Sequence, residues 1–337
     1  ARPCRARRHA SVANEFAPPT PDLSVCNRQS KIENQKSKIE NRKSEMLITS
    51  PDSIQEVLVS AVRALGARNG YASARLEAEI LLAHTLKISR ALLLAHLGDA
   101  IAEEDAAQFA GMVARRAQGE PLAYIVGHQE FYGLDLIVDQ RVLIPRPETE
   151  HLVELALRAL KRIPHPEPVI VDVGTGSGAI ALALARHTAH PKIMATDISA
   201  DALAVARLNA TRLNLTERVE FRNADLLDGI AAPIDLLTAN LPYIPLEREA
   251  QLPREIRQYE PRLALLGGLD GLNVIRRLLK QVESHMARAG FIFLEISEEQ
   301  GDATRALARA ILPDARVQIH RDLEELDRVV EIQLGRG

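Results

Sequence analysis

An apolar strand that leads directly into a glycine-rich turn constrains the fold of this chain more than any other feature. The strand is VIVDV at 169–173, and the turn is GTGSG at 174–178, followed by a helical pattern. Glycine lets the backbone turn sharply and lets a ligand approach where a Cβ would block it. An almost continuously apolar strand is typical of a parallel sheet covered on both faces. The segment therefore predicts an α/β domain with a ligand site at the carboxyl end of this strand.

The rest of the back half continues the alternation of strand and helix. Further strands are predicted at 192–197, 218–222, 234–239 and 290–296, and helices at 178–187, 199–212, 271–288 and 298–311. Two final strands, at 315–320 and 328–334, have no helix between them and are expected to form an antiparallel edge pair. The fold class is therefore α/β, a Rossmann-like, doubly wound and mostly parallel sheet of seven strands.

The front half has a helical pattern and then an extended one. A helix is expected after the cap Ser50-Pro51-Asp52, and others at 73–86, 89–97 and 102–118. Residues 131–138 are typical of two strands with a turn, and the two prolines of IPRPETE force an extended loop before a helix that begins near Glu148. We therefore predict a small N-terminal all-α domain at 46–123, a β-hairpin linker at 124–150 and a catalytic domain at 151–337.

Residues 1–45 differ from the rest of the chain. They contain ten Lys/Arg and five Asp/Glu, a net charge of +5, and a heptad repeat, SKIENQK followed by SKIENRK. A coiled coil needs two apolar residues per heptad and this repeat has one, so a disordered tail is expected. Met46 directly precedes the first amphipathic pattern, and we expect it to be the natural start, with 1–45 not part of the native protein. The alternative is an Arg-rich transit peptide.

Charge and composition argue against several classes of protein. The whole chain has a net charge of −3, so residues 46–337 carry −8, and there is no Trp. Stable nucleic-acid binding is not expected, because it usually needs a basic surface and many stacking aromatic rings. Two cysteines, Cys4 and Cys26, are too few for a disulfide scaffold or a Cys-ligated zinc site. No apolar run is long enough to span a membrane, and a cytoplasmic protein is expected.

Two acidic residues follow the next two strands in register with the glycine turn. Asp197 lies nineteen residues after Gly178, where a carboxylate can accept hydrogen bonds from two ribose hydroxyls. Asp225 follows the third strand, where it can reach an adenine amino group, and Leu226 can cover the ring. The spacing GxGxG differs from the GxGxxG of a dinucleotide site. The arrangement resembles the S-adenosylmethionine site of class I methyltransferases.

This resemblance implies S-adenosylmethionine as cofactor, S-adenosylhomocysteine as product and no metal. In that family the position of Asp172 lies near the methionine end of the cofactor, where it can help to satisfy the ammonium group. The cofactor-binding residues it implies here are Asp172, Val173, Gly174, Thr175, Gly176, Gly178, Asp197, Asp225, Leu226 and Asn240.

The fourth strand ends in Asn240-Leu241-Pro242-Tyr243, and these four residues are predicted to be catalytic. The nitrogen of an amide, or of an adenine amino group, is a poor nucleophile because its lone pair is delocalised. Asn240 Oδ1 and the Leu241 carbonyl could accept its two N–H groups, hold it towards a methyl donor and favour the pyramidal geometry that frees the lone pair. Tyr243 can pack on the flat acceptor group. The structural alternative is an Asn-Pro turn that closes a strand.

Segments from both halves of the chain together resemble one family. They are RLEAEILLAH at 75–84, GEPLAYIVG at 119–127, EFYG at 130–133, IPRPETE at 144–150, DVGTGSGAIALALA at 172–185, YEPRLALLGGLDGL at 259–272 and DLEELDRVVE at 322–331. They look like the HemK/PrmC family, the release-factor glutamine N5-methyltransferases, over residues 50–334. The family usually has a second proline where Leu241 stands, and it often has Gly-Tyr after the Glu-Ile at 295–296, where this chain has Ser-Glu.

The resemblance implies a protein substrate, the glutamine of the Gly-Gly-Gln loop in peptide chain release factors 1 and 2. It also implies that the helical domain grips the release factor and that Arg146, Glu148 and residues 240–243 bind the substrate. A monomer would suffice. The alternatives are an N6-adenine methyltransferase acting on ribosomal RNA or DNA, because NLPY also occurs in ribosomal RNA adenine dimethyltransferases, and a catalytically idle adaptor that binds the cofactor or the release factor.

Several charged residues have both a functional and a structural interpretation. Arg146 and Glu148 could instead form an ion pair on the proline loop. Glu295 either orients active-site groups or ends a strand facing solvent. The segment 259–262 is expected to pack near residues 240–243, and Arg115-Arg116 is expected to be a solvated helix end.

Overall fold

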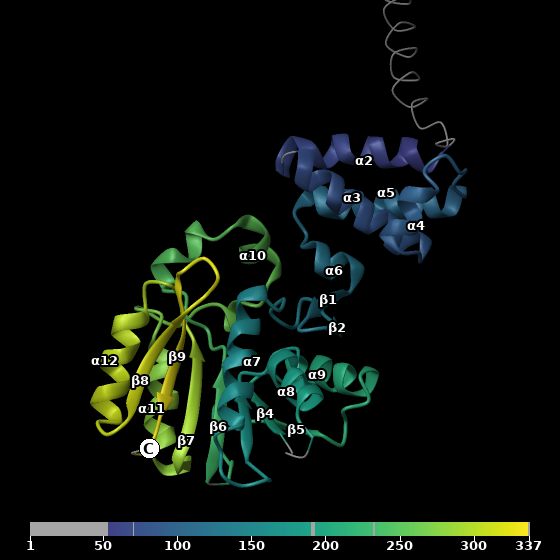
Figure 1. Ribbon diagram of the computed structural model, residues 1–337. Coiled ribbons are helices and arrows are strands. Elements are labelled where there is room, and N and C mark those ends of the chain that lie inside the picture. The colour runs from purple at the N-terminus through teal and green to yellow at the C-terminus, as the bar shows by residue number, and fades with distance from the viewer. Residues whose placement is uncertain (1–52, 70, 190–192, 232, 336–337) are drawn as a thin grey trace, which may run out of the picture.

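The computed structural model describes residues 53–69, 71–189, 193–231 and 233–335. The tail at 1–45 with its repeat, and the cap at Ser50-Pro51-Asp52, lie outside the described residues. Figure 1 shows two parts, a cluster of helices and a larger part built on a sheet, with a short hairpin between them.

Within the described residues, the first part contains five helices that enclose one apolar core. They are α2 (Ile54–Asn69), α3 (Tyr71–Leu86), α4 (Arg90–Ala95), α5 (Glu103–Gln118) and α6 (Leu122–Val126). Leu58, Leu81 and Phe109 lie in this core. Helix α5 has acidic residues in its first turn, where they complement the helix dipole, and is capped by Gly119 at a φ of 98°. The predicted helices at 73–86, 89–97 and 102–118 are confirmed with small shifts of their ends. None of the described helices, here or in the second part, could cross a membrane.

A β-hairpin follows, and a buried asparagine joins it to the glycine turn. Strands β1 (His128–Phe131) and β2 (Leu134–Ile137) pair antiparallel. Asn209 Oδ1 accepts the Ile137 N–H at 2.6 Å, and Asn209 Nδ2 donates to the carbonyls of Ile137 and Ser177 at 3.0 and 2.9 Å. Because Ser177 belongs to the glycine turn, the linker and the predicted ligand site are connected through one side chain.

The second part is built on a seven-stranded sheet, as predicted. Its strands are β3 (Ile170–Val173), β4 (Ile193–Asp197), β5 (Val219–Asn223), β6 (Ile234–Ala239), β7 (Met286–Glu295), β8 (Arg316–Arg321) and β9 (Asp327–Gln333). They are ordered β5-β4-β3-β6-β7-β9-β8, and β9 runs in the direction opposite to the other six strands. The expected antiparallel edge pair is therefore β8 and β9, and the class I methyltransferase fold is confirmed.

Helices cover both faces of the sheet (Figure 1). Helices α7 (Pro147–Leu160), α8 (Ala179–His187) and α9 (Ala200–Arg212) lie on one face, and α11 (Asn273–His285) and α12 (Gly301–Ile311) on the other. Ile170 belongs to the apolar cluster of the first face and its neighbour Val171 to that of the second. Successive side chains of a strand point to opposite faces, which explains why β3 is almost continuously apolar.

The strand order reverses at β3. The chain moves from β3 outward through β4 to β5, and then returns to pair β6 with the free side of β3. The loops after β3 and β6 therefore diverge, and such a point forms a crevice for ligands. Between β6 and α11 the chain forms three short helices that no local pattern predicted, η1 (Leu246–Gln251), α10 (Arg254–Tyr259) and η2 (Arg262–Ala264).

The expectation that Arg115-Arg116 forms a solvated helix end is wrong for Arg116. Its side chain is 9% exposed and pairs with Glu77 of α3 and with Glu255 of α10, each at 2.8 Å. Its Nη1 also donates to the Glu120 carbonyl at 3.0 Å. These partners raise the pKa of Arg116 against the effect of burial. Since α10 belongs to the second part of the chain, this arginine connects the helical cluster to it.

Candidate active site

The glycine turn carries the chain from β3 into α8. Gly174, Gly176 and Gly178 have φ values of 72°, 56° and 84°, a region that residues with a Cβ rarely adopt. The N–H groups of Gly174 and Thr175 donate to the Thr196 carbonyl at 2.8 and 2.9 Å, which fixes the turn against β4. A Cβ at Gly176 would have no neighbouring atom within 4 Å. The turn therefore faces open space beside Gly176.

Asp197 ends β4 and faces the glycine turn. Its Oδ2 accepts the Gly176 N–H at 2.9 Å, and its Oδ1 accepts the Ser199 N–H at 2.8 Å. Burial raises the pKa of Asp197, and the two backbone donors oppose the rise. An ionised carboxylate offers about four acceptor positions, so about two remain for a ligand.

Asp225 and Leu226 line the same crevice from the loop after β5. Asp225 Oδ2 accepts a hydrogen bond from Arg277 Nη2 of α11 at 2.5 Å. Leu226 has a φ of 57°, a conformation that costs a residue with a Cβ about 1–3 kcal/mol. The Thr196 hydroxyl donates to its carbonyl at 2.9 Å and so helps to hold it there. Strained residues of this kind gather at ligand sites.

Asn240 follows the end of β6, directly across from the glycine turn. Its Nδ2 donates to Thr149 Oγ1 at 3.1 Å, and Thr149 is buried in the first turn of α7. Since the amide nitrogen is used in this way, Oδ1 is available to a ligand. Leu241 is buried, and its Cδ2 would lie 2.9 Å from a Cβ at Gly174. The loop after β6 therefore packs tightly on the turn after β3.

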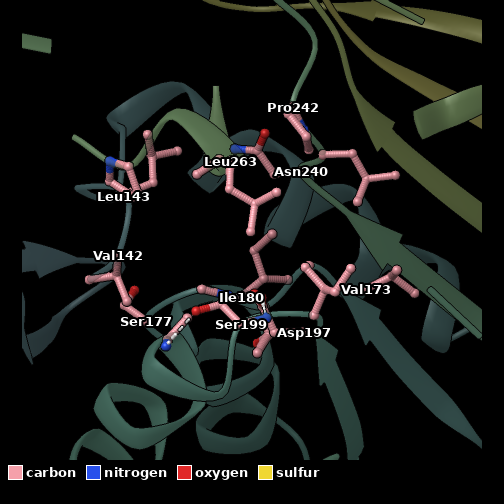
Figure 2. A pocket seen from close by; sticks show the side chains of 18 of the residues that line it. Val142, Leu143, Val173, Ser177, Ile180, Asp197, Ser199, Asn240, Pro242 and Leu263 are labelled. Atoms are coloured by element: carbon pink, nitrogen blue, oxygen red, sulfur yellow. Dashed lines mark hydrogen bonds between the residues drawn. The ribbon is translucent and has the colours of Figure 1, made fainter. Parts of the chain in front are cut away.

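These groups line one pocket at the carboxyl ends of the strands, with a cavity volume of about 200 Å³. Figure 2 shows Asn240 and Pro242 at one end of it and Asp197 and Ser199 at the other. The predicted site residues that line this pocket are Val173, Gly174, Thr175, Gly176, Asp197, Asp225, Leu226, Asn240, Leu241, Pro242 and Arg146.

A smaller pocket adjoins the first and shares Asn240 with it. It is lined by Leu143, Arg146, Asn240, Tyr243, Ile244, Ile256, Ala264, Leu265 and Glu295. The Tyr243 hydroxyl lies 3.5 Å from Glu295 Oε1, and burial raises the pKa of Tyr243. Glu295 is 2% exposed, so the alternative that it faces solvent is wrong. Burial raises the pKa of Glu295 to about 7, and the Thr149 and Asn240 side chains and the charge of Arg328 oppose the rise.

The proline loop is fixed by an ion pair that differs from the suggested one. Arg146 binds the buried carboxylate of Glu260 and not Glu148. Glu260 also accepts the Ile144 N–H at 3.3 Å, so the segment 259–262 lies against this loop. Arg146 lines both pockets, whereas Glu148 is exposed and lines neither.

Two residues predicted to bind the cofactor lie behind the glycine turn and do not line the pocket. Asp172 is fully buried, and its Oδ1 accepts a hydrogen bond from Thr238 Oγ1 at 2.9 Å. Burial raises its pKa to about 6. A Cβ at Gly178 would lie 3.0 Å from Leu182 Cδ1, so this glycine allows close packing of the turn on α8. Both residues support the turn from its protein side.

Sequence reasoning missed Thr149 and Arg277 as residues of the site. Thr149 lies inside the IPRPETE segment, but its local pattern gave no sign that it faces Asn240, which is 91 residues away. Arg277 is one of several charged residues of α11, and only the packing of this helix places it beside Asp225.

Comparison with known proteins supports both parts of the chain. Residues 56–127 match the PrmC N-terminal domain, and residues 153–255 match the methyltransferase small domain. A curated protein of Moorella thermoacetica named release factor glutamine methyltransferase is 43% identical over 277 residues, which are 82% of this chain and 96% of the relative. A protein of the same name from Rhodopirellula baltica is 38% identical over 79% of this chain and 91% of its own.

Among solved structures, the protein-(glutamine-N5) methyltransferase (release factor-specific) of Alicyclobacillus acidocaldarius is 30% identical. The match covers 57% of this chain and 95% of that chain, with a TM-score of 0.37. The match to the Moorella relative extends over nearly its whole length, so the helical part and the sheet part are shared together. By this identity and coverage, the chain belongs to the release factor glutamine methyltransferase family.

Proposed function

We propose that this chain transfers the methyl group of S-adenosylmethionine to the side-chain amide nitrogen (N5) of the glutamine in the Gly-Gly-Gln loop of peptide chain release factors 1 and 2. The observation that carries the proposal is the orientation of Asn240. Its nitrogen is bound to Thr149 at 3.1 Å, and its side chain lines both pockets. An acceptor amide can therefore meet Asn240 Oδ1 from the smaller pocket. The names of the curated relatives support the choice of substrate.

We infer that the larger pocket binds S-adenosylmethionine, with S-adenosylhomocysteine as the product. Ribose hydroxyls are hydrogen-bond donors, and Asp197 keeps about two free acceptor positions after binding Gly176 and Ser199. Asp225 can accept from the adenine amino group, with Leu226 packed beside the ring. The open space at Gly176 admits a ligand close to the backbone. When bound, this cofactor supplies an electrophilic methyl group on a positively charged sulfur, and the reaction needs no metal.

The residues after β6 would position the acceptor. Asn240 Oδ1 and the Leu241 carbonyl accept the two N–H groups of the glutamine amide, so the nitrogen faces the larger pocket. Tyr243, which lines the smaller pocket, packs on the plane of the amide. A preorganised polar group of this kind is worth about 10²–10³ in kcat. The methylated nitrogen is acidic and releases one proton, so no dedicated base is required. Leu241 in place of the usual proline provides the same carbonyl.

The proposal also assigns a separate role to each part of the chain. The helical domain at 46–123 would contact the release factor, the segment 124–150 would link it to the active site, and residues 151–337 would carry out the transfer. The contact of Arg116 with Glu77 and Glu255 supports this, because it fixes the helical cluster relative to α10. The protein would act as a monomer in the cytoplasm, where release factors are found.

To test this proposal, the full chain is incubated with labelled S-adenosylmethionine and one of three acceptors. These are a release factor, the same factor with the Gly-Gly-Gln glutamine replaced, and ribosomal RNA. We expect label in the intact factor alone. Label in the RNA would favour the N6-adenine alternative, and equal label in both factors would exclude the Gly-Gly-Gln glutamine as the acceptor. Cofactor binding without any transfer would favour the idle adaptor.

A further inference from the structure

Thr149 belongs to a polar cluster with Asn240 and Glu295, two residues that line the smaller pocket together. Its Oγ1 accepts from Asn240 Nδ2 at 3.1 Å. Its hydroxyl also interacts with Glu295 at the end of β7 and lowers the pKa of that carboxyl. Thr149 is 4% exposed and Glu295 is 2% exposed. Side chains from α7, from the loop after β6 and from β7 thus form a short polar chain that ends at the acceptor site.

The direction of the hydrogen bonds among these three side chains decides which end of the Asn240 amide points towards the substrate. The carbonyl and amino ends of an asparagine amide have nearly the same shape, so apolar packing does not distinguish them. A threonine hydroxyl does not distinguish them either, because it donates and accepts. An ionised carboxylate only accepts. When the Thr149 hydroxyl donates its hydrogen bond to Glu295, Thr149 can only accept from Asn240. Asn240 must then turn its nitrogen towards Thr149 and its Oδ1 away from it.

We propose that Thr149 and Glu295 are positioning residues that fix the amide orientation of Asn240, and with it the acceptor presented to the reacting nitrogen. The inference rests on the proposed function, since it requires Asn240 Oδ1 to accept from the substrate amide. Thr149 acts through Asn240, and Glu295 acts through Thr149 and through its own contact with the Asn240 amide.

The surroundings of Glu295 make the direction of these hydrogen bonds sensitive to pH. The charged and titratable groups around it are Tyr243 after β6, Arg328 on β9, and Arg146 and Glu148 at the start of α7. Within the described residues, its Oε2 has no hydrogen-bond partner. Burial raises the pKa of Glu295 to about 7. A protonated Glu295 can donate to Thr149, and Thr149 would then no longer select one orientation of the Asn240 amide. Since Glu295 loses this proton as the pH rises, kcat should rise as the pH passes through neutrality.

The central experiment compares Thr149→Val with Thr149→Ser in the full chain, with a release factor as substrate. Valine removes the hydroxyl at nearly constant volume, and serine keeps it. We expect Thr149→Val to lower kcat about tenfold or more, with an unchanged Kd for S-adenosylmethionine by calorimetry, and Thr149→Ser to retain most of the turnover. Thr304→Val is the matched control, because Thr304 on α12 is fully buried and its hydroxyl has no partner among the described residues.

Glu295→Gln tests the carboxylate of this hydrogen-bonded series of side chains. Glutamine can donate as well as accept and does not titrate, so kcat should fall and its rise near neutral pH should disappear. Normal kcat in Thr149→Val would overturn the inference. So would a loss of cofactor binding in both Thr149 variants, which would indicate a merely structural role. If kcat still rises with pH in Glu295→Gln, Glu295 does not control the orientation of Asn240.

The wild-type protein keeps the two proposals distinguishable. If it methylates no release factor, the proposed function fails and the inference fails with it. If the wild type and Thr149→Val methylate the factor equally well, only the inference fails.

Discussion

The N–H of Gly176 donates to Asp197 Oδ2 at 2.9 Å. This bond joins the turn after β3 to the end of β4 through the carboxylate that is proposed to hold the cofactor. Ser199 binds the other oxygen of the same carboxylate at 2.8 Å, so its position is fixed before a ligand arrives. Preorganisation of this kind reduces the ordering that binding would otherwise require.

Asp197→Ala should weaken cofactor binding. The change removes the ribose acceptors and leaves the N–H groups of Gly176 and Ser199 without their partner. Hydrogen bonds to a charged group are worth about 1.5–3 kcal/mol, which corresponds to a Kd raised roughly tenfold to hundredfold. Calorimetry with S-adenosylmethionine measures it, with the exposed Asp201→Ala of α9 as control. An unchanged Kd would remove Asp197 from the cofactor site.

Asn240→Ala should impair the transfer step more than it weakens cofactor binding. It removes the proposed acceptor Oδ1, whose loss should lower kcat by about 10²-fold or more. Single-turnover transfer to a release factor measures the chemical step, and calorimetry measures cofactor binding in the same variant. Near-normal turnover would contradict the role assigned to Asn240.

Arg116→Ala should loosen the helical cluster from the second part of the chain. It removes an arginine that binds Glu77 on α3 and Glu255 on α10, and breaking a buried ion pair costs about 3 kcal/mol. We expect faster proteolysis near the hairpin and a higher KM for the release factor, with little change in cofactor Kd. Arg115→Ala is the matched control, since Arg115 is 47% exposed and pairs with Glu120 nearby. Equal behaviour of the two variants would contradict this prediction.

Asp172 should make stability depend on pH. Burial raises its pKa from the ordinary 3.8 to about 6, so the folded state binds the proton more tightly than the unfolded state does. The stabilisation is therefore fully present below about pH 4 and is lost as the pH rises through about 6. Asp172→Asn is neutral throughout this range. The free energy of unfolding of the wild type, measured relative to Asp172→Asn by denaturant titration, should fall by up to about 3 kcal/mol between pH 4 and 7. A constant difference would show that Asp172 is not perturbed.

Much of the fold and part of the candidate site followed from local patterns. The apolar run of β3, the glycines after it and the helical period of α8 lie within about twenty residues of one another, so their meaning does not depend on distant partners. The spacing from Gly178 to Asp197 is set by one helix and one strand, which fixes where the acid emerges. Asn240 was placed by the same logic, as the residue after a parallel strand. Two further predicted residues, Asp172 and Gly178, do not line the pocket but support the glycine turn, and their role in cofactor binding stays a prediction.

The sequence by itself determined the sheet, its helices and the loops that meet at the carboxyl ends of the strands, because strand and helix periods are local properties. Only the tertiary structure decided which side chains meet there. Thr149 reaches Asn240 across 91 residues, and Arg116 reaches Glu255 across 139. Such contacts depend on the order of the strands and on the path of the loops, and no period in the sequence records them. The orientation of one amide in the site therefore depends on partners that only folding brings together.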